Sequence, residues 1–183
     1  MTLPFQGFPK IPRLYRDIVI TEKLDGTNAS IYIGEDGTFL AGSRNRWLTV
    51  GDDNYGFAKW AEDNKDELLK LGKGHHFGEW WGVGIQHGYG LSERRFSLFN
   101  TAKWSNPDTR PACCHVVPVL YQGVFSESAI NKAIDSLKRY GSFAARGYMK
   151  PEGIIIYHTA ANSMFKITLE NDEQPKGITH GKH

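Results

Sequence analysis

The sequence predicts an α+β fold in which mainly antiparallel sheets are flanked by helices. Many short runs rich in β-branched and aromatic residues are separated by turn residues, whereas only two segments have the apolar periodicity of a substantial helix. The length of 183 residues favours one domain with a sizeable core. Hydrophobic residues make up 40% of the chain and charged residues 23%, the balance of an ordinary globular protein. These observations favour a single α+β domain.

The first part of the chain predicts an extended lead-in followed by a hairpin. Three prolines lie before Tyr15 and exclude a helix there. Strands are then expected at residues 18–20, 29–33 and 38–41, with a Gly-Glu-Asp-Gly turn before the last of them. The first two strands flank a polar segment, Thr21–Asn28.

Two helices and a further series of strands are expected in the rest of the chain. The first helix is predicted from about Asp53 to Leu71, with Gly72 as its stop. The second should begin near Ser126, capped by that serine or by Ser128, and end at Gly141. The later strands are expected at residues 76–81, 96–99, 116–121, 153–157 and 164–169.

Composition favours a soluble protein of the cytoplasm. The only cysteines, Cys113 and Cys114, are adjacent and give no framework of spaced pairs, which fits a reducing compartment. The N-terminus lacks the features of a secretion signal, and no apolar stretch approaches the ~20 residues that span a bilayer. We therefore expect no membrane partner. The net charge of +2 does not by itself demand a nucleic-acid partner, although a local basic groove remains compatible with it.

The polar segment between the first two strands carries the clearest chemistry. It has the sequence Thr-Glu-Lys-Leu-Asp-Gly-Thr-Asn and includes Lys23 and Asp25. A lysine attacks an electrophile only in its neutral form, which desolvation and nearby positive charge favour. In isolation, Lys-x-Asp-Gly is more typical of an exposed turn than of a catalytic site.

With its flanks, this segment resembles motif I of the covalent nucleotidyltransferases, which comprise DNA ligases, RNA ligases and mRNA capping enzymes. The Thr-Asn ending is most similar to the double-strand RNA ligases. The resemblance implies that Lys23 attacks the α-phosphate of a nucleoside triphosphate and releases pyrophosphate. It also implies an ATP-grasp-like nucleotidyltransferase domain with a nucleotide cleft between its sheets.

Two downstream segments resemble the next motifs in order. Gly-Ser-Arg-Asn-Arg at 42–46 resembles the segment whose arginine, here Arg44, contacts the substrate phosphate, a role that suits the planar guanidinium. Phe-Gly-Glu-Trp at 77–80 resembles motif III, whose glutamate, here Glu79, contacts the ribose and lies near the metal. Taken alone, the first segment fits a solvated basic turn equally well, whereas the second is more typical of a strand glutamate that faces water.

A third segment resembles motif IIIa, in which an aromatic residue stacks on the purine. Phe-Ser-Leu-Phe-Asn at 96–100 places Phe99 at that position. Stacking on a base is worth ~1–3 kcal/mol in single-strand binders. Members of the family usually carry aspartate after this phenylalanine, whereas this chain has Asn100. On its own, Phe99 fits an ordinary core aromatic.

The last two segments resemble motifs IV and V. Pro-Glu-Gly-Ile-Ile-Ile at 151–156 implies that Glu152 holds the metal. Met-Phe-Lys-Ile-Thr at 164–168 implies that Lys166 serves the phosphates. The family usually has a second lysine two residues later, where this chain has Thr168, so either one lysine suffices or the frame is shifted.

Taken together, the resemblance implies an ATP-dependent polynucleotide ligase, most similar to the RNA ligases. The implied catalytic residues are Lys23, Asp25 and Lys166. The implied nucleotide-binding residues are Glu22, Asn28, Arg44, Glu79, Phe99, Glu152 and Lys166. Mg²⁺ is the expected metal, with Mn²⁺ as the alternative and Glu152 and Glu79 as its ligands, because a hard cation prefers oxygen. The alternatives are a small DNA ligase, a guanylyltransferase, and a catalytically impaired nucleotide- or nucleic-acid-binding module.

Domain content and partners follow from the same resemblance. Residues 1–183 are expected to form one nucleotidyltransferase domain, because the chain after about residue 170 is too short for an OB domain or a C-terminal helical domain. The expected partners are polynucleotide ends, RNA rather than DNA. The end-binding surface then lies around the cleft or comes from a protein partner.

Overall fold

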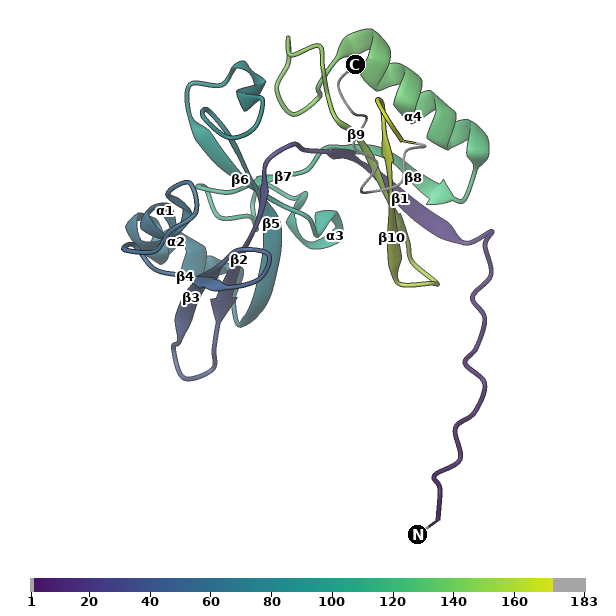
Figure 1. Ribbon diagram of the computed structural model, residues 1–183, viewed down its shortest axis with the longest axis horizontal. Helices are drawn as coiled ribbons and strands as arrows, with labels where there is room; N and C mark the ends of the chain where they lie inside the picture. Colours follow the sequence, from purple (N-terminus) through teal and green to yellow (C-terminus); the bar gives the residue numbers. More distant parts are fainter. Residues whose placement is uncertain (1, 173–183) are drawn as a thin grey trace, which may run out of the picture.

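The computed structural model describes residues 2–172 and contains two sheets whose strands are mainly antiparallel (Figure 1). One sheet has four strands in the order β10-β9-β1-β8, and all its pairings are antiparallel. The other has six strands in the order β4-β3-β2-β5-β6-β7, in which only β6 and β7 run parallel. The predicted α+β class, with mainly antiparallel sheets flanked by helices, is confirmed.

The strands of the four-stranded sheet are β1 (Asp17–Lys23), β8 (Val119–Val124), β9 (Gly153–His158) and β10 (Ser163–Thr168). Those of the six-stranded sheet are β2 (Thr27–Ile33), β3 (Phe39–Gly42), β4 (Trp47–Leu48), β5 (Gly74–Gly82), β6 (Arg94–Leu98) and β7 (His115–Val116). The helical elements are α1 (Phe57–Asp63), α2 (Lys65–Leu68), η1 (Leu69–Leu71), η2 (Gly88–Gly90), α3 (Thr101–Trp104) and α4 (Glu127–Tyr140).

Helices cover one face of each sheet. The amphipathic helix α4 packs Ile130, Ala133 and Leu137 against Ile18 and Ile20 of the four-stranded sheet. Residues of α1, α2 and η1 cover the six-stranded sheet, with a core that includes the buried rings of Phe57, Trp80 and Phe96. Because side chains alternate along a strand, the residues between the core positions project from the opposite face of each sheet.

The second predicted helix is confirmed at both ends. Its N-cap is Ser126, whose Oγ accepts a hydrogen bond from the backbone N–H of Ala129 at 3.1 Å. Its C-cap is Gly141, with a φ of 76°. None of the helices in the described part of the chain is both long enough and apolar enough to span a membrane.

The first predicted helix is shorter than expected and interrupted. Tyr55 and Gly56 have φ values of 50° and 75°, so the helix begins only at Phe57. Asp53 instead accepts hydrogen bonds from the backbone N–H groups of Ala58 and Lys59, at 2.7 and 3.0 Å, and caps α1 from outside. Asn64, with φ −111° and ψ 18°, separates α1 from α2.

The strand expected at residues 116–121 is divided between the two sheets. Pro118 has no N–H to donate, and its carbonyl accepts the N–H of Glu22 at 3.0 Å. The chain therefore leaves β7 of the six-stranded sheet and enters β8 of the four-stranded sheet across this proline.

Candidate active site

The predicted polar segment is the link between the two sheets. Lys23 is the last residue of β1 in the four-stranded sheet, and Thr27 is the first residue of β2 in the six-stranded sheet. Gly26 lies in the link because a Cβ atom there would clash with the backbone carbonyl oxygen of Trp80. The link therefore presses against β5 and brings side chains of both sheets to one place.

Lys23 is held by a carboxylate from the neighbouring strand. Its Nζ lies 2.7 Å from Oε1 of Glu152, and both side chains are partly buried. The register explains the contact, because Lys23 pairs with Gly153 and Glu152 directly precedes it. Oε2 of Glu152 is buried and has no hydrogen-bond partner among the described residues. Such an oxygen is costly to leave unsatisfied and is therefore available to a ligand.

One face of the six-stranded sheet is not covered by α1, α2 and η1, and we call it the uncovered face. On this face, contacts join Glu79 to Asn28 and Asn28 to Arg44. Asn28 pairs with Glu79 across β2 and β5. With its amide turned to satisfy both neighbours, Asn28 donates to Oε1 of Glu79 at 3.2 Å and accepts from Nη2 of Arg44 at 2.7 Å. The structure thus brings together three residues that the motifs predicted separately.

Burial raises the pKa of the Glu79 carboxyl to about 7. The positive charge of Lys23 and a hydrogen bond from the backbone of Gly26 oppose this shift, whereas the negative charges of Glu152 and Asp25 add to it. Glu152 and Asp25 are therefore close enough to influence the pKa of Glu79. A cation or a second positive group near Glu79 would favour its ionised form.

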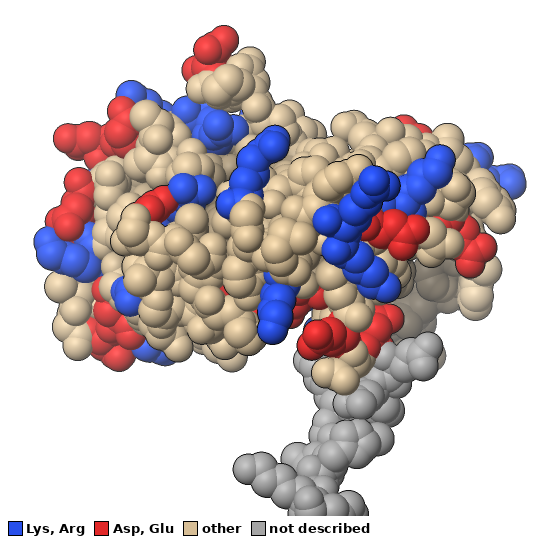
Figure 2. Space-filling view, turned by 90° about the horizontal axis from the view of Figure 1, so that it is seen from above, with Lys and Arg blue, Asp and Glu red and all other residues tan. Residues whose placement is uncertain are grey.

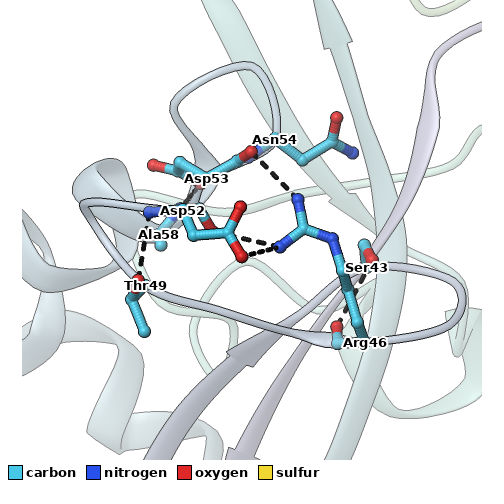
Figure 3. A network of polar contacts seen from close by, with 7 residues as sticks. All are labelled: Ser43, Arg46, Thr49, Asp52, Asp53, Asn54 and Ala58. Atoms are coloured by element: carbon cyan, nitrogen blue, oxygen red, sulfur yellow. Dashed lines mark hydrogen bonds and ion pairs between the residues drawn. The ribbon is translucent and has the colours of Figure 1, made fainter.

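A network around Arg46 fixes the loop that carries Arg44 (Figure 3). The guanidinium of Arg46 lies 2.9 Å from Oδ2 of Asp52 and donates to the backbone carbonyls of Asp52 and Asp53, both at 3.2 Å. The carbonyl of Arg46 in turn accepts the N–H of Ser43 at 2.8 Å. The two arginines of the segment therefore differ in role, since Arg46 anchors the loop and Arg44 reaches the site.

Asp25 has two partners that sequence reasoning missed. Its Oδ2 lies 2.5 Å from Nδ1 of His87, which is exposed. Its backbone N–H donates to the hydroxyl of Tyr89 at 2.9 Å. Tyr89 is 3% exposed and packs edge-on against Trp81. The Gly-rich segment between β5 and β6 therefore holds the link that follows Lys23 in place. Its contacts with Asp25 join residues more than 60 positions apart, so no sequence pattern indicates them.

Glu22 projects from the sheet face opposite to that of Lys23, and its carboxylate is fully engaged there. It is 1% exposed, and its carboxylate accepts hydrogen bonds from the hydroxyl of Ser142 and from the N–H groups of Phe143 and Ala144, at 2.7, 2.7 and 3.1 Å. Burial raises the pKa of Glu22, and these bonds oppose the shift. The structure gives the side chain an anchoring contact with the segment after α4 and does not bring it beside Glu79 or Arg44.

Lys166 and Phe99 occupy the margins of the site. Lys166 pairs with Ile155, which pairs with Thr21, so Lys166 projects from the same sheet face as Lys23. Phe99 follows β6 on the face that carries Glu79, is 38% exposed, and donates its N–H to the carbonyl of Phe77 at 3.0 Å. No described contact joins either side chain directly to Lys23 or Glu79.

The donor set suits a hard divalent cation bound together with phosphate oxygens. Among residues 2–172 no group of three or more His, Cys, Asp or Glu side chains stands ready to hold a metal by itself. Mg²⁺ is usually bound by one or two carboxylates plus substrate phosphates, and the unpartnered Oε2 of Glu152 offers one such ligand. Glu79 supplies the second carboxylate nearby.

Comparisons with known proteins show the family of the chain and solved structures with a similar fold. A family model described as RNA ligase matches residues 16–168. The fold is similar to that of mutants of Naegleria gruberi RNA ligase, one an apo form at 23% identity and TM-score 0.59, covering 84% of this chain and 49% of that one. Another mutant of the same enzyme, solved with AMP and Mn, has 20% identity and a TM-score of 0.57. That match covers 85% of this chain and 50% of the mutant's chain. This chain thus spans about half the length of these structures. No curated protein sequence matches it significantly.

Proposed function

The chain belongs to the RNA ligase family, and from that premise we propose that it is the nucleotidyltransferase domain of an ATP-dependent RNA ligase. The observation that carries the proposal is the Lys23–Glu152 contact of 2.7 Å at the junction of the two sheets, with Glu79, Asn28 and Arg44 assembled beside it. Naegleria gruberi RNA ligase, which shares the fold, has been solved with ATP and Mn.

In the first step, the neutral amine of Lys23 attacks the α-phosphorus of ATP. A P–N bond forms, the bond between the α-phosphorus and the bridging oxygen breaks, and pyrophosphate leaves with that electron pair. Oε1 of Glu152 is the nearest base to the departing lysine proton, at 2.7 Å from Nζ. Lys166 and Arg44 offset charge on the phosphates, and Asp25 lines the link.

The later steps return the lysine to its starting form. A 5′-phosphate oxygen of the polynucleotide attacks the lysyl-bound phosphorus, and the P–N bond breaks. A 3′-hydroxyl then attacks the 5′-phosphorus, and AMP leaves. When bound, a divalent metal supplies charge neutralisation at the phosphates, and Glu152 and Glu79 are the residues that would hold it.

On the face seen in Figure 2, binding of a polynucleotide would have to rely on local contacts. Lysine and arginine side chains are interspersed there with aspartate and glutamate, without a broad surface of one sign (Figure 2). This agrees with the net charge of +2. A protein partner that supplies further end binding is compatible with the site and belongs to the same proposal.

A labelling experiment tests the proposal. The protein is incubated with Mg²⁺, or with Mn²⁺, and each radiolabelled nucleoside triphosphate in turn, and covalent label is sought on the intact chain. We expect label from ATP that is absent in Lys23→Ala and retained in the control Lys138→Ala, because Lys138 is an exposed residue of α4.

Three outcomes would decide against parts of the proposal. Absence of label from every nucleotide would leave a catalytically impaired binding module, whereas label from GTP alone would indicate a guanylyltransferase. A sealing assay on nicked RNA, nicked DNA and single strands then identifies the polynucleotide. Sealing of DNA but not of RNA would replace the RNA ligase with a DNA ligase.

A further inference from the structure

Aromatic side chains form a continuous strip on the uncovered face of the six-stranded sheet. The strip consists of Tyr32, Trp47, His75 and Phe77, from β2, β4 and β5. The rings of Trp47 and His75 are stacked with centroids 5.6 Å apart, and those of His75 and Phe77 are 4.1 Å apart. Tyr32 meets His75 edge-on at 5.9 Å. Trp47 is 50% exposed and Phe77 55%, so the strip is open to solvent.

The sheet supports this strip with small residues. Trp47 pairs with Gly42, Gly42 with Ser30, and Ser30 with Phe77, so the four positions form one row across the sheet. A Cβ atom at Gly42 would come within 3.2 Å of the Trp47 ring. Nε2 of His75 lies 2.9 Å from Oγ of Ser30, and this contact holds the imidazole between the rings of Trp47 and Phe77. The rings are therefore held in place by the sheet and by one another.

The strip is continuous with the candidate active site. Asn28 and Glu79 form the next row of the same face, two residues farther along β2 and β5 than Ser30 and Phe77. Two residues of a strand span about 7 Å. Arg44 lies in the loop that joins Gly42 to Trp47, and its guanidinium contacts Asn28. A polynucleotide strand that enters the site from this side has to pass over the strip.

We propose that the aromatic strip binds unpaired bases of the RNA strand whose end is delivered to Lys23. The proposal rests on the proposed function and names the form of RNA that the surface fits. Large exposed aromatic groups that adjoin a site usually mark an interaction surface. Flat rings offer stacking to any base, and single-strand binders combine such rings with a positive group for the backbone, which Arg44 supplies here. Bases inside a duplex are already stacked and cannot reach the rings.

Direct binding measurements on the full chain test this proposal. The probe is a short 5′-phosphorylated single-stranded RNA with a fluorescent label, and its dissociation constant is measured by anisotropy. Trp47→Leu and Phe77→Leu keep apolar bulk but remove the flat ring. Each is expected to weaken binding about tenfold, the effect of one lost stacking contact. Tyr140→Ala, which removes an exposed ring at the end of α4, is the matched control and should bind as the wild type does.

Two further probes separate stacking from other roles. An RNA of the same length that lacks bases should bind the wild type and the two leucine variants equally, and so should a blunt duplex. Thermal unfolding of each variant identifies any loss of folded protein. Equal affinity of wild type and folded leucine variants for the single strand would overturn the proposal, and so would an equal loss for duplex and single strand.

The result is independent of the labelling of Lys23. If the protein is labelled by ATP and the leucine variants bind single strands normally, the strip has no role in RNA binding but the proposed function stands. If the protein is never labelled and the leucine variants lose binding, the strip is a single-strand binding surface and the ligase function fails.

Discussion

Oε1 of Glu152 lies 2.7 Å from Nζ of Lys23, while Oε2 of the same carboxylate is buried without a hydrogen-bond partner in the described part of the chain. One oxygen is therefore directed at the lysine and the other is left for a ligand. A carboxylate in this position can accept the lysine proton and also contribute to a cation site, and a neutral isostere can do neither in the same way.

Replacing Glu152 by glutamine should show whether labelling of Lys23 depends on the charge of this side chain or only on its shape. Glu152→Gln retains the volume and one oxygen but loses the negative charge that Lys23 and a cation require. We expect covalent labelling of Lys23 to slow by about 100-fold, the usual contribution of a positioned acid–base group, even when ATP is in excess. The measurement is the single-turnover rate of labelling. Wild-type behaviour would show that Glu152 is not the motif IV residue.

Glu79 should make the stability of the protein depend on pH. Its pKa is about 7 in the folded chain and 4.5 ordinarily, so between these values the folded state holds a proton that the unfolded state releases. The free energy of unfolding should therefore fall as pH rises from 4.5 to 7, by at most about 3 kcal/mol for this shift. Glu79→Gln should remove that dependence, as measured by denaturant unfolding without divalent metal.

The pH dependence of the free energy of unfolding of the wild type is not sufficient by itself for this test. Burial lowers the pKa of His75, His76 and His115, which makes stability rise with pH in the same range, and Glu22 acts in the same direction as Glu79. The difference between wild type and Glu79→Gln cancels these shared contributions. A difference that stays constant from pH 4.5 to 7 would contradict the raised pKa of Glu79.

Glu22 should matter mainly for stability. Glu22→Ala would leave the part-buried N–H groups of Phe143 and Ala144 and the buried hydroxyl of Ser142 without their acceptor, and we expect it to lower the free energy of unfolding by about 2–4 kcal/mol. Glu22→Gln supplies an amide oxygen for the same donors and should restore most of the loss. Denaturant unfolding measures both variants. A folded Glu22→Gln that accepts GTP in place of ATP would instead support the predicted role in reading the base.

Much of the fold could be predicted because local signals agreed with the tertiary structure. Every predicted strand overlaps an observed one, and α4 begins and ends at Ser126 and Gly141 as the capping pattern indicates. Of the two errors, one has a long-range cause and the other a local one. Pro118 divides one predicted strand because its two sides pair in different sheets, and the first helix is delayed by the left-handed conformations of Tyr55 and Gly56.

The site was predicted as separate motifs, and the structure supplies their register. Asn28, Glu79 and Arg44 meet because β2 pairs with β5 on one side and with β3 on the other. The supports of the site could not be predicted, since His87 and Ser142 contact residues that are 62 and 120 positions away in the chain. Nothing in a single sequence indicates such pairings.

In the predicted motif V frame, Thr168 stands where the family usually has a second lysine, and the strand register shows which sheet face that position occupies. Thr168 pairs with Gly153, and Gly153 pairs with Lys23, so the three residues form one row across β10, β9 and β1. A lysine at 168 would project from the face that carries Lys23 and Lys166. We expect Thr168→Lys to speed labelling of Lys23 by about tenfold through added stabilisation of phosphate charge. Thr168→Met, of similar length and uncharged, is the control. An equal gain in both variants, or none in either, would show that position 168 does not face the phosphates.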